Sequence, residues 1–311
     1  MARVIRPLRM MGAHFVARHI KESEFLPISI VPSFLYGITW RQKISSAQVK
    51  SAILLAGLFS EGETIVLESV ISRDHTERML KLFGANIEIQ KARTQIMRSC
   101  LETPKQITVP GDISSAAFFV VAGLLVKDSK IIIRNVGINP TRSGILNVLK
   151  RMGGRIKLLN KKDLVEPVAD IEVSSSDLRA TIIKKDEIPS LIDELPILMI
   201  AASLAKGKSV FEGVGELRVK ETDRIESMRW NLMKLGADVR VKGLKEREMI
   251  EIIGSKTLKG SSLKSFSDHR TAMSMVIASL AAKSSSHLDD TTCINKSFPQ
   301  FLPTLRHLFV R

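Results

Sequence analysis

Two kinds of helix-to-strand pattern alternate along the chain. In the first kind, apolar residues at helical spacing lead to a glycine and a small residue, and a strand pattern follows directly. A glycine at that point suits a helix end, because it tolerates a left-handed backbone. This pattern occurs at residues 8–13, 80–85, 149–154 and 232–237.

The second kind is a helix rich in small residues, followed by a short turn and an apolar strand. It occurs at residues 51–67, 116–133, 195–211 and 271–288. In the first three, the turn carries Gly62, Asp128-Ser129 or Gly207. Together the two kinds predict a unit of helix, strand, helix and strand pair, repeated about every 70 residues. Such alternation indicates an α/β protein with crossover connections.

The repeat also predicts the domain organisation. A strand pattern at residues 107–109 stops at the turn Pro110-Gly111-Asp112, and a helix pattern follows at once. We therefore place two domains at residues 1–110 and 111–311. The second helix of the first unit ends at Gly12 with no earlier helix or strand. We thus expect the chain to start within a unit and its first domain to be incomplete.

Composition restricts the class of protein. The chain is 44% hydrophobic and 25% charged, as globular proteins are. Its apolar runs at 116–126 and 195–205 are too short to span a bilayer, so we expect no membrane association. Residues 1–21 are basic and contain no acid, as in organelle presequences, but residues 8–16 belong to the repeat. Cys100 and Cys293 form no metal or disulfide pattern, which favours the cytoplasm.

The net charge of +15 calls for anionic partners. Only 5% of the residues are aromatic, and the basic residues are spread along the chain instead of forming a tail. Platforms on which bases could stack are therefore scarce. Small anionic substrates explain the charge better than nucleic acid does.

The densest candidate chemistry is the stretch Lys220-Glu221-Thr222-Asp223-Arg224, which precedes an apolar helical pattern ending at Gly236. We expect this stretch on the first turn of a helix, where backbone N–H groups attract anions. A second interpretation stays open at this point. Glu221 and Asp223 could simply complement the dipole of a solvated helix start.

Other predicted helix starts carry polar groups too. They are Ser45-Ser46-Ala47-Gln48, Asp193-Glu194-Leu195-Pro196, Asp268-His269-Arg270 and Lys296-Ser297-Phe298-Pro299. Each alone is consistent with a helix cap. Together they predict one cleft lined by the positive ends of helix dipoles, suited to a ligand with phosphate and carboxylate groups.

Seven motifs in order make the chain similar to the EPSP synthase family, the 3-phosphoshikimate 1-carboxyvinyltransferases. The most specific are Leu-Arg-Val-Lys-Glu-Thr-Asp-Arg at 217–224 and Asp-His-Arg at 268–270. The others are Ser-Ala-Gln-Val-Lys-Ser-Ala at 46–52, Arg-Asp-His-Thr-Glu at 73–77, Pro-Gly-Asp-Ile-Ser-Ser-Ala at 110–116, Asp-Glu-Leu-Pro at 193–196 and Lys-Ser-Phe-Pro at 296–299. The resemblance extends over essentially the whole chain.

The resemblance implies a fold and a reaction. The fold would have two domains of βαβαββ units with pseudo-threefold symmetry, the first domain being partial here. The reaction would transfer the enolpyruvyl group of phosphoenolpyruvate to the 5-hydroxyl of shikimate 3-phosphate and release phosphate. This step belongs to the shikimate pathway of aromatic amino acid biosynthesis. No metal or organic cofactor is implied, and the enzyme would be a monomer.

The resemblance also implies residue roles. Asp193 and Glu221 would be the catalytic acid–base pair. Shikimate 3-phosphate would be bound on the first-domain side by Ser46, Ala47, Gln48 and Arg73, and otherwise by Asp193 and Lys220. Phosphoenolpyruvate would be bound by Gln48, Arg224, Arg270 and Lys296. Arginine suits such contacts, because its planar guanidinium pairs with carboxylate and phosphate through two hydrogen bonds.

Two family motifs have no counterpart here: Leu-Pro-Gly-Ser-Lys-Ser with its lysine, and the Gly-Asn-Ser-Gly-Thr loop with its arginine. Both would contribute substrate-binding cations, so we expect impaired activity from these 311 residues alone. Two other readings remain open: a non-catalytic protein that binds an anion or a partner, and the related carboxyvinyltransferase acting on UDP-N-acetylglucosamine. A nucleic-acid-binding module is a more distant alternative.

Overall fold

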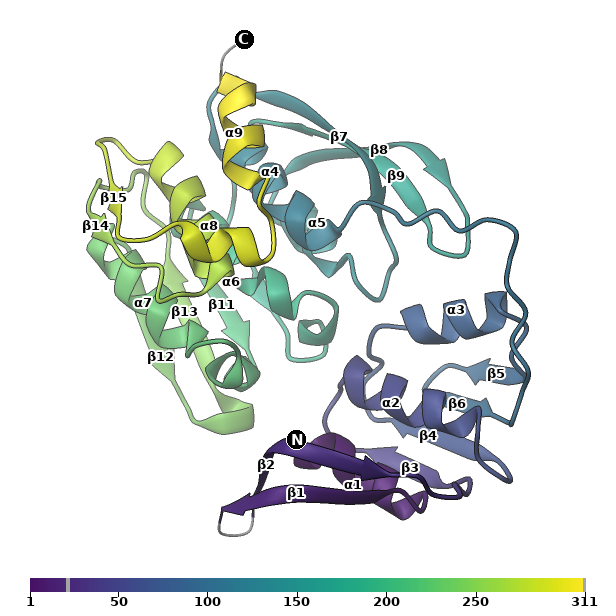
Figure 1. The fold of residues 1–311 in the computed structure, drawn as a ribbon. Coiled ribbons are helices and arrows are strands. Elements are labelled where there is room, and N and C mark those ends of the chain that lie inside the picture. The colour runs from purple at the N-terminus through teal and green to yellow at the C-terminus, as the bar shows by residue number, and fades with distance from the viewer. Residues whose placement is uncertain (21–22, 310–311) are drawn as a thin grey trace. The chain divides into compact units, whose positions relative to one another are not determined.

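The computed structural model describes residues 1–20 and 23–309 of the chain (Figure 1). Lys21 of the basic N-terminal stretch and residues 310–311 of the predicted second domain lie outside the described residues. The chain divides into two compact units, Met1–Val109 and Pro110–Arg311. Helices and strands alternate in both, which confirms the predicted α/β class. The roles assigned to the two predicted domains stay predictions.

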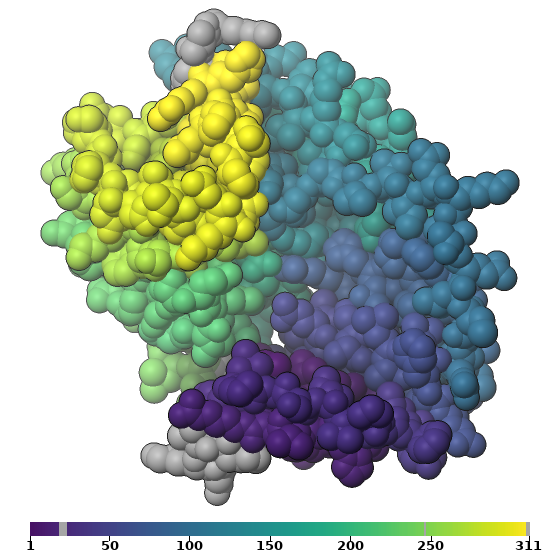
Figure 2. All heavy atoms as spheres, viewed as in Figure 1, coloured from purple at the N-terminus to yellow at the C-terminus, as the bar shows by residue number. Residues whose placement is uncertain are grey.

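The first unit contains a hairpin and one complete repeat. Helix α1 (Ala2–Met10) leads into antiparallel strands β1 (His14–Ile20) and β2 (Ser23–Val31), which lie at the surface in Figure 2. The repeat consists of β3 (Thr39–Gln42), α2 (Ala47–Gly57), β4 (Thr64–Glu68), α3 (His75–Leu82), β5 (Ile87–Gln90) and β6 (Arg93–Ile96). The sheet order is β3-β4-β6-β5, and α2 connects the parallel strands β3 and β4.

The second unit contains two further repeats and part of another. The first consists of α4 (Ile113–Leu125), β7 (Lys130–Gly137), α5 (Gly144–Arg151), β8 (Arg155–Lys162) and β9 (Val168–Ser174). The next consists of β10 (Ile182–Ile183), α6 (Leu195–Leu204), β11 (Lys208–Glu212), α7 (Arg224–Lys234), β12 (Asp238–Lys242) and β13 (Met249–Ile253). The last elements are β14 (Ser262–Leu263), α8 (His269–Leu280), β15 (His287–Leu288) and α9 (Phe301–Phe309).

In the described part of this unit, five short 3-10 helices connect these elements. They are η1 (Ile188–Ser190), η2 (Ile192–Glu194), η3 (Gly215–Val219), η4 (Lys245–Arg247) and η5 (Thr292–Lys296). The larger sheets of this unit have the orders β7-β9-β8 and β10-β11-β13-β12. The latter is the order found in the first unit, with a parallel first pair and antiparallel later strands.

The helices with many small residues form the centre of the second unit. Helices α4, α6 and α8 pack against one another, and nearly every residue of α4 and α6 is buried. This confirms the interpretation that small residues allow burial on several sides. The amphipathic helices α5 and α7 each bury one face against the adjoining strands β8 and β12.

The predicted helix ends are confirmed by the backbone. Gly12, Gly84, Gly153 and Gly236 have φ of 100°, 77°, 92° and 86°, and each directly follows the C-cap residue of an amphipathic helix. This left-handed region is open to glycine at little cost. The glycine followed by a small residue in the sequence therefore correctly predicted where these helices end.

The predicted strand at residues 107–109 is wrong. These residues form no regular structure, and the side chains of Ile107 and Val109 are 44% and 82% exposed. An apolar run becomes a strand only where a neighbouring strand can pair with it. Among the described residues, no helix is long and apolar enough to cross a membrane.

Candidate active site

The second unit brings five predicted site residues to the starts of three helices. Asp193 lies in η2 directly before α6, Arg224 is the first residue of α7, and Arg270 is the second residue of α8. Lys220 and Glu221 lie in the turn between η3 and α7. Because α6, α7 and α8 pack against one another, their charged starts meet.

The carboxylate of Asp193 is surrounded by cations. Its Oδ1 lies 3.9 Å from Lys220 Nζ and 3.7 Å from Arg224 Nη1. Its Oδ2 lies 3.8 Å from Arg142 Nη2 and 4.0 Å from Arg270 Nη2. Arg270 Nη1 also donates to the backbone oxygen of Asp193 at 3.1 Å. The Asp193 carboxylate therefore lies in a strongly positive environment.

Arg224 is the most buried of these cations, with a side chain only 1% exposed. Its Nε donates to Asp268 Oδ2 at 2.8 Å, and its Nη2 donates to Glu221 Oε2 at 2.5 Å. Its Nη1 is buried and has no hydrogen-bond partner within residues 1–20 and 23–309. A buried guanidinium N–H without an acceptor is costly, so this position suits an incoming anion.

The interpretation that the acids of the 220–224 stretch merely cap a helix is correct for Asp223. Its Oδ1 accepts hydrogen bonds from the N–H groups of Ile225 and Glu226, both at 3.1 Å. The expectation that the whole stretch forms the first helical turn is wrong. Residues 220–222 precede α7, because the Asp223 cap fixes where the helix begins. Glu221 is thereby left 53% exposed beside Arg224.

Asp268 has two structural tasks. Its Oδ1 caps α8 by accepting from the N–H groups of Arg270 at 2.7 Å and Thr271 at 3.1 Å. Its Oδ2 pairs with Arg224. One buried carboxylate thus connects α7 to α8. Burial lowers the pKa of the neighbouring His269, as does the charge of Arg270, while Asp268 opposes the shift.

Lys296 is the remaining predicted site residue of the second unit. It forms none of the ion pairs around Asp193 that are described above. It lies exposed at the end of η5, which packs against α8. Among the described residues, no group of three or more His, Cys, Asp or Glu could hold a metal ion.

A buried ion pair beside Asp193 was not predicted from the sequence. Arg142 and Glu194 are 8% and 1% exposed and are joined by two hydrogen bonds, of 2.6 and 2.9 Å. Burial disfavours the charged guanidinium, but attraction to Glu194, and then to Asp193, raises the pKa of Arg142 overall. One sequence signal could have pointed to Arg142: it lies two residues before the first residue of α5, and other site residues lie near the starts of their helices.

In the first unit, the predicted residues lie at one edge of a sheet. Ser46 caps α2, with its hydroxyl accepting from the N–H of Val49 at 3.4 Å, and Gln48 is exposed on the first turn. Arg73 lies half-buried in the loop between β4 and α3. Since β3 and β4 are parallel neighbours, the residues that follow them share the same edge. Ala47 adds a backbone N–H at the start of α2.

A buried charge network, which was not predicted from the sequence either, holds this edge together. Lys50 Nζ of α2 lies 2.8 Å from Glu68 Oε2 and 2.6 Å from Glu77 Oε1 of α3. Glu68 Oε1 accepts from the N–H of Ser72, the residue before Arg73, at 3.0 Å. Burial raises the pKa of Glu77, and Lys50 opposes this shift. The network therefore fixes the backbone that carries Arg73.

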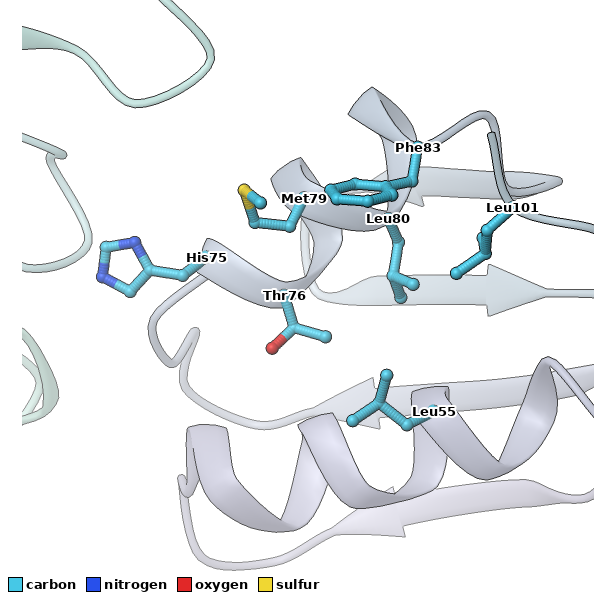
Figure 3. Close-up of a pocket in the computed structure, with 7 residues that line it drawn as sticks. All are labelled: Leu55, His75, Thr76, Met79, Leu80, Phe83 and Leu101. Carbon is cyan, nitrogen blue, oxygen red and sulfur yellow. The ribbon is translucent and has the colours of Figure 1, made fainter. Parts of the chain in front are cut away.

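A cavity of about 330 Å³ lies between α2 and α3 (Figure 3). Its lining is mostly apolar, and Figure 3 shows Leu55 of α2 facing Leu80 of α3, while the His75 ring points away. Such a surface offers few polar partners for phosphate or carboxylate groups. The charged cluster of the second unit is therefore the better candidate site.

Comparison with known proteins identifies close relatives. The family model for EPSP synthase (3-phosphoshikimate 1-carboxyvinyltransferase) matches residues 1–305. The 3-phosphoshikimate 1-carboxyvinyltransferase of Geotalea uraniireducens is 48% identical over all of this chain and 71% of its own length. That of Petrotoga mobilis is 49% identical over 97% of this chain and 69% of its own length.

Solved structures of similar proteins agree with the family match. An EPSP synthase from Acinetobacter baumannii is 38% identical and superimposes with a TM-score of 0.85, covering 99% of this chain and 70% of the other. The enolpyruvyl transferase NikO of Streptomyces tendae has a TM-score of 0.75 at 17% identity, over 98% of this chain and 70% of the other, which supports the fold alone.

Proposed function

Because the chain belongs to the EPSP synthase family, we propose that it catalyses the reaction for which that family is named. The enolpyruvyl group of phosphoenolpyruvate is transferred to the 5-hydroxyl of shikimate 3-phosphate. The products are 5-enolpyruvylshikimate 3-phosphate and phosphate, within aromatic amino acid biosynthesis. The substrates are small anions, which agrees with the net charge of +15.

One observation supports this proposal above the others. The buried Nη1 of Arg224 has no hydrogen-bond partner among the described residues, and it lies beside the carboxylate of Asp193, which four cations surround. In the proposal, Arg224 and Arg270 bind the carboxylate and phosphate of phosphoenolpyruvate, with Lys296 and Gln48 completing its site. Arginines in a largely buried site bind such groups strongly, because little water competes for them.

Asp193 and Glu221 carry the proton transfers in this proposal. The oxygen of the 5-hydroxyl bonds to C2 of phosphoenolpyruvate while Asp193 accepts the proton of that hydroxyl. Glu221 protonates the methylene carbon of phosphoenolpyruvate. Elimination then breaks the bond between C2 and the phosphate oxygen and removes a proton from the new methyl group. The two carboxylates can exchange roles between the steps. The 53% exposure of Glu221 leaves it accessible to a substrate.

Shikimate 3-phosphate is assigned to Ser46, Ala47, Gln48 and Arg73, together with Lys220 and Asp193. The start of α2 supports this assignment, because the backbone N–H groups at a helix start and the helix dipole favour phosphate there. We further propose a cytoplasmic monomer that binds no nucleic acid. The free thiols of Cys100 and Cys293 fit a reducing compartment.

The test is phosphate release from phosphoenolpyruvate. Since the 311 residues contain neither the Leu-Pro-Gly-Ser-Lys-Ser nor the Gly-Asn-Ser-Gly-Thr motif, we expect almost no turnover from the chain alone. Turnover should appear when the part of the Geotalea uraniireducens enzyme that this chain does not match is supplied in trans. It should require shikimate 3-phosphate. Release that instead requires UDP-N-acetylglucosamine, or no release in any mixture, would overturn the proposal.

A further inference from the structure

The ion pair of Arg142 and Glu194 has no part in the function proposed above. Both oxygens of Glu194 are occupied: Oε2 accepts from Arg142 Nη1 at 2.6 Å, and Oε1 accepts from Arg142 Nη2 at 2.9 Å. The hydroxyl of Ser114, the second residue of α4, donates to Oε1 at 2.6 Å and accepts from Arg142. The loop after β7, the start of α4 and the end of η2 therefore meet at this carboxylate.

The carboxylate of Glu194 also lies close enough to Arg270 to compete with Asp193 for its guanidinium. Its Oε1 lies 3.8 Å from Arg270 Nη1, which donates at 3.1 Å to the backbone oxygen of the preceding residue, Asp193. A buried carboxylate without its own cation would draw this guanidinium towards itself, because an unpaired buried charge is unstable. Arg142 removes that pull by neutralising Glu194. Its own Nη2 also lies 3.8 Å from Asp193 Oδ2.

We propose that Arg142 is a positioning residue: by occupying both oxygens of Glu194, it leaves Arg270 directed at Asp193 and at the incoming anion. Only the identity of that anion, phosphoenolpyruvate, rests on the proposed function. The competition between Glu194 and Arg270 rests on the geometry of the second unit alone.

The first experiment needs no substrate. The guanidinium ¹H–¹⁵N signals of the 311-residue chain are recorded, and the Arg270 signal is assigned by its loss in Arg270→Lys. In Arg142→Gln the Arg270 signal should shift and its hydrogen exchange with water should slow, because Arg270 now pairs with Glu194. In the double variant Arg142→Gln/Glu194→Gln it should return towards the wild-type position, since the neutral amide cannot capture Arg270.

The second experiment measures binding by calorimetry, with the unmatched part of the Geotalea uraniireducens enzyme present. Arg142→Gln should weaken phosphoenolpyruvate binding about tenfold or more. The double variant should recover to within about threefold of wild type, and shikimate 3-phosphate binding should change little in either. Arg240→Gln is the matched control, because Arg240 forms an exposed pair with Asp238. It should leave both affinities unchanged.

The outcomes separate the two proposals. An Arg270 signal that is unchanged in Arg142→Gln, or a phosphoenolpyruvate affinity that stays low in the double variant, overturns the positioning role. If Arg142→Gln fails to fold, the double variant and Arg142→Lys carry the test, since both avoid an unpaired Glu194. If the Arg270 signal moves as expected but wild type binds no phosphoenolpyruvate, the positioning role stands and the proposed function fails.

Discussion

The buried ion pair between Arg224 and Asp268 should contribute strongly to the stability of the second unit. Arg224→Met removes the cation and keeps most of the side-chain volume, so Asp268, 0% exposed, retains its helix-capping bonds but loses its charge partner. Breaking a buried pair in this way costs about 3–5 kcal/mol. For a unit of this size, that corresponds to a melting temperature lower by about 6–20 °C.

A double-mutant cycle tests this reasoning. Asp268→Asn should cost about 1.5–3 kcal/mol, because it keeps the cap but removes the charge from the hydrogen bond. The double variant should cost about 1–3 kcal/mol less than the sum of the single variants. Arg229→Met is the control, because Arg229 forms an exposed pair with Glu226 on the same helix. It should change stability by less than about 0.5 kcal/mol.

The measurement is urea unfolding followed by circular dichroism, with wild type, the single variants, the double variant and the control recorded under the same conditions. Single-variant effects that add within about 0.5 kcal/mol would refute the pair as a coupled unit. An Arg224→Met variant as stable as the Arg229→Met control would refute the burial argument itself.

Three further outcomes are expected. The pKa of His269 is lowered from 6.5, so the unfolded state binds a proton more readily than the folded state does, and stability should fall as the pH drops below about 6.5. His269→Gln should weaken this pH dependence of the melting temperature between about pH 5 and pH 7. Gly84→Ala should cost about 1–2 kcal/mol in urea unfolding and Gly84→Asn clearly less, because a Cβ there has open space and only the φ of +77° penalises it; equal costs would contradict this. In calorimetry, the 311-residue chain should prefer shikimate 3-phosphate over phosphoenolpyruvate, and an equal or reversed preference would count against Ser46, Gln48 and Arg73.

The repeat could be predicted because its signals are local. A glycine such as Gly153 ends a helix whatever packs around it, and Gly62, Asp128 and Gly207 have the positive φ that short helix-to-strand turns require. The strand predicted at residues 107–109 depended on a neighbour that the fold does not provide. Strand formation is decided by tertiary pairing, which local pattern does not contain.

The candidate site was predictable in part for a similar reason. Asp193, Glu221, Arg224 and Arg270 lie in recognisable motifs, and the structure brings them together. Arg142 was missed because its partner, Glu194, lies 52 residues further along the chain. Lys50 was missed because one lysine in a helix normally points to solvent, whereas this one is 1% exposed between two acids.

The central claim is that the charged cluster performs acid–base chemistry and is not merely a set of helix caps. Its most direct test is phosphate release by Asp193→Asn and Glu221→Gln in the protein supplied with the unmatched part of the Geotalea uraniireducens enzyme. Each change keeps the side-chain size and removes the capacity to transfer a proton. Turnover should therefore fall by about 10²–10⁴-fold, while substrate affinities stay within a few-fold of wild type. Normal turnover in both variants, with only an earlier melting transition, would contradict the account.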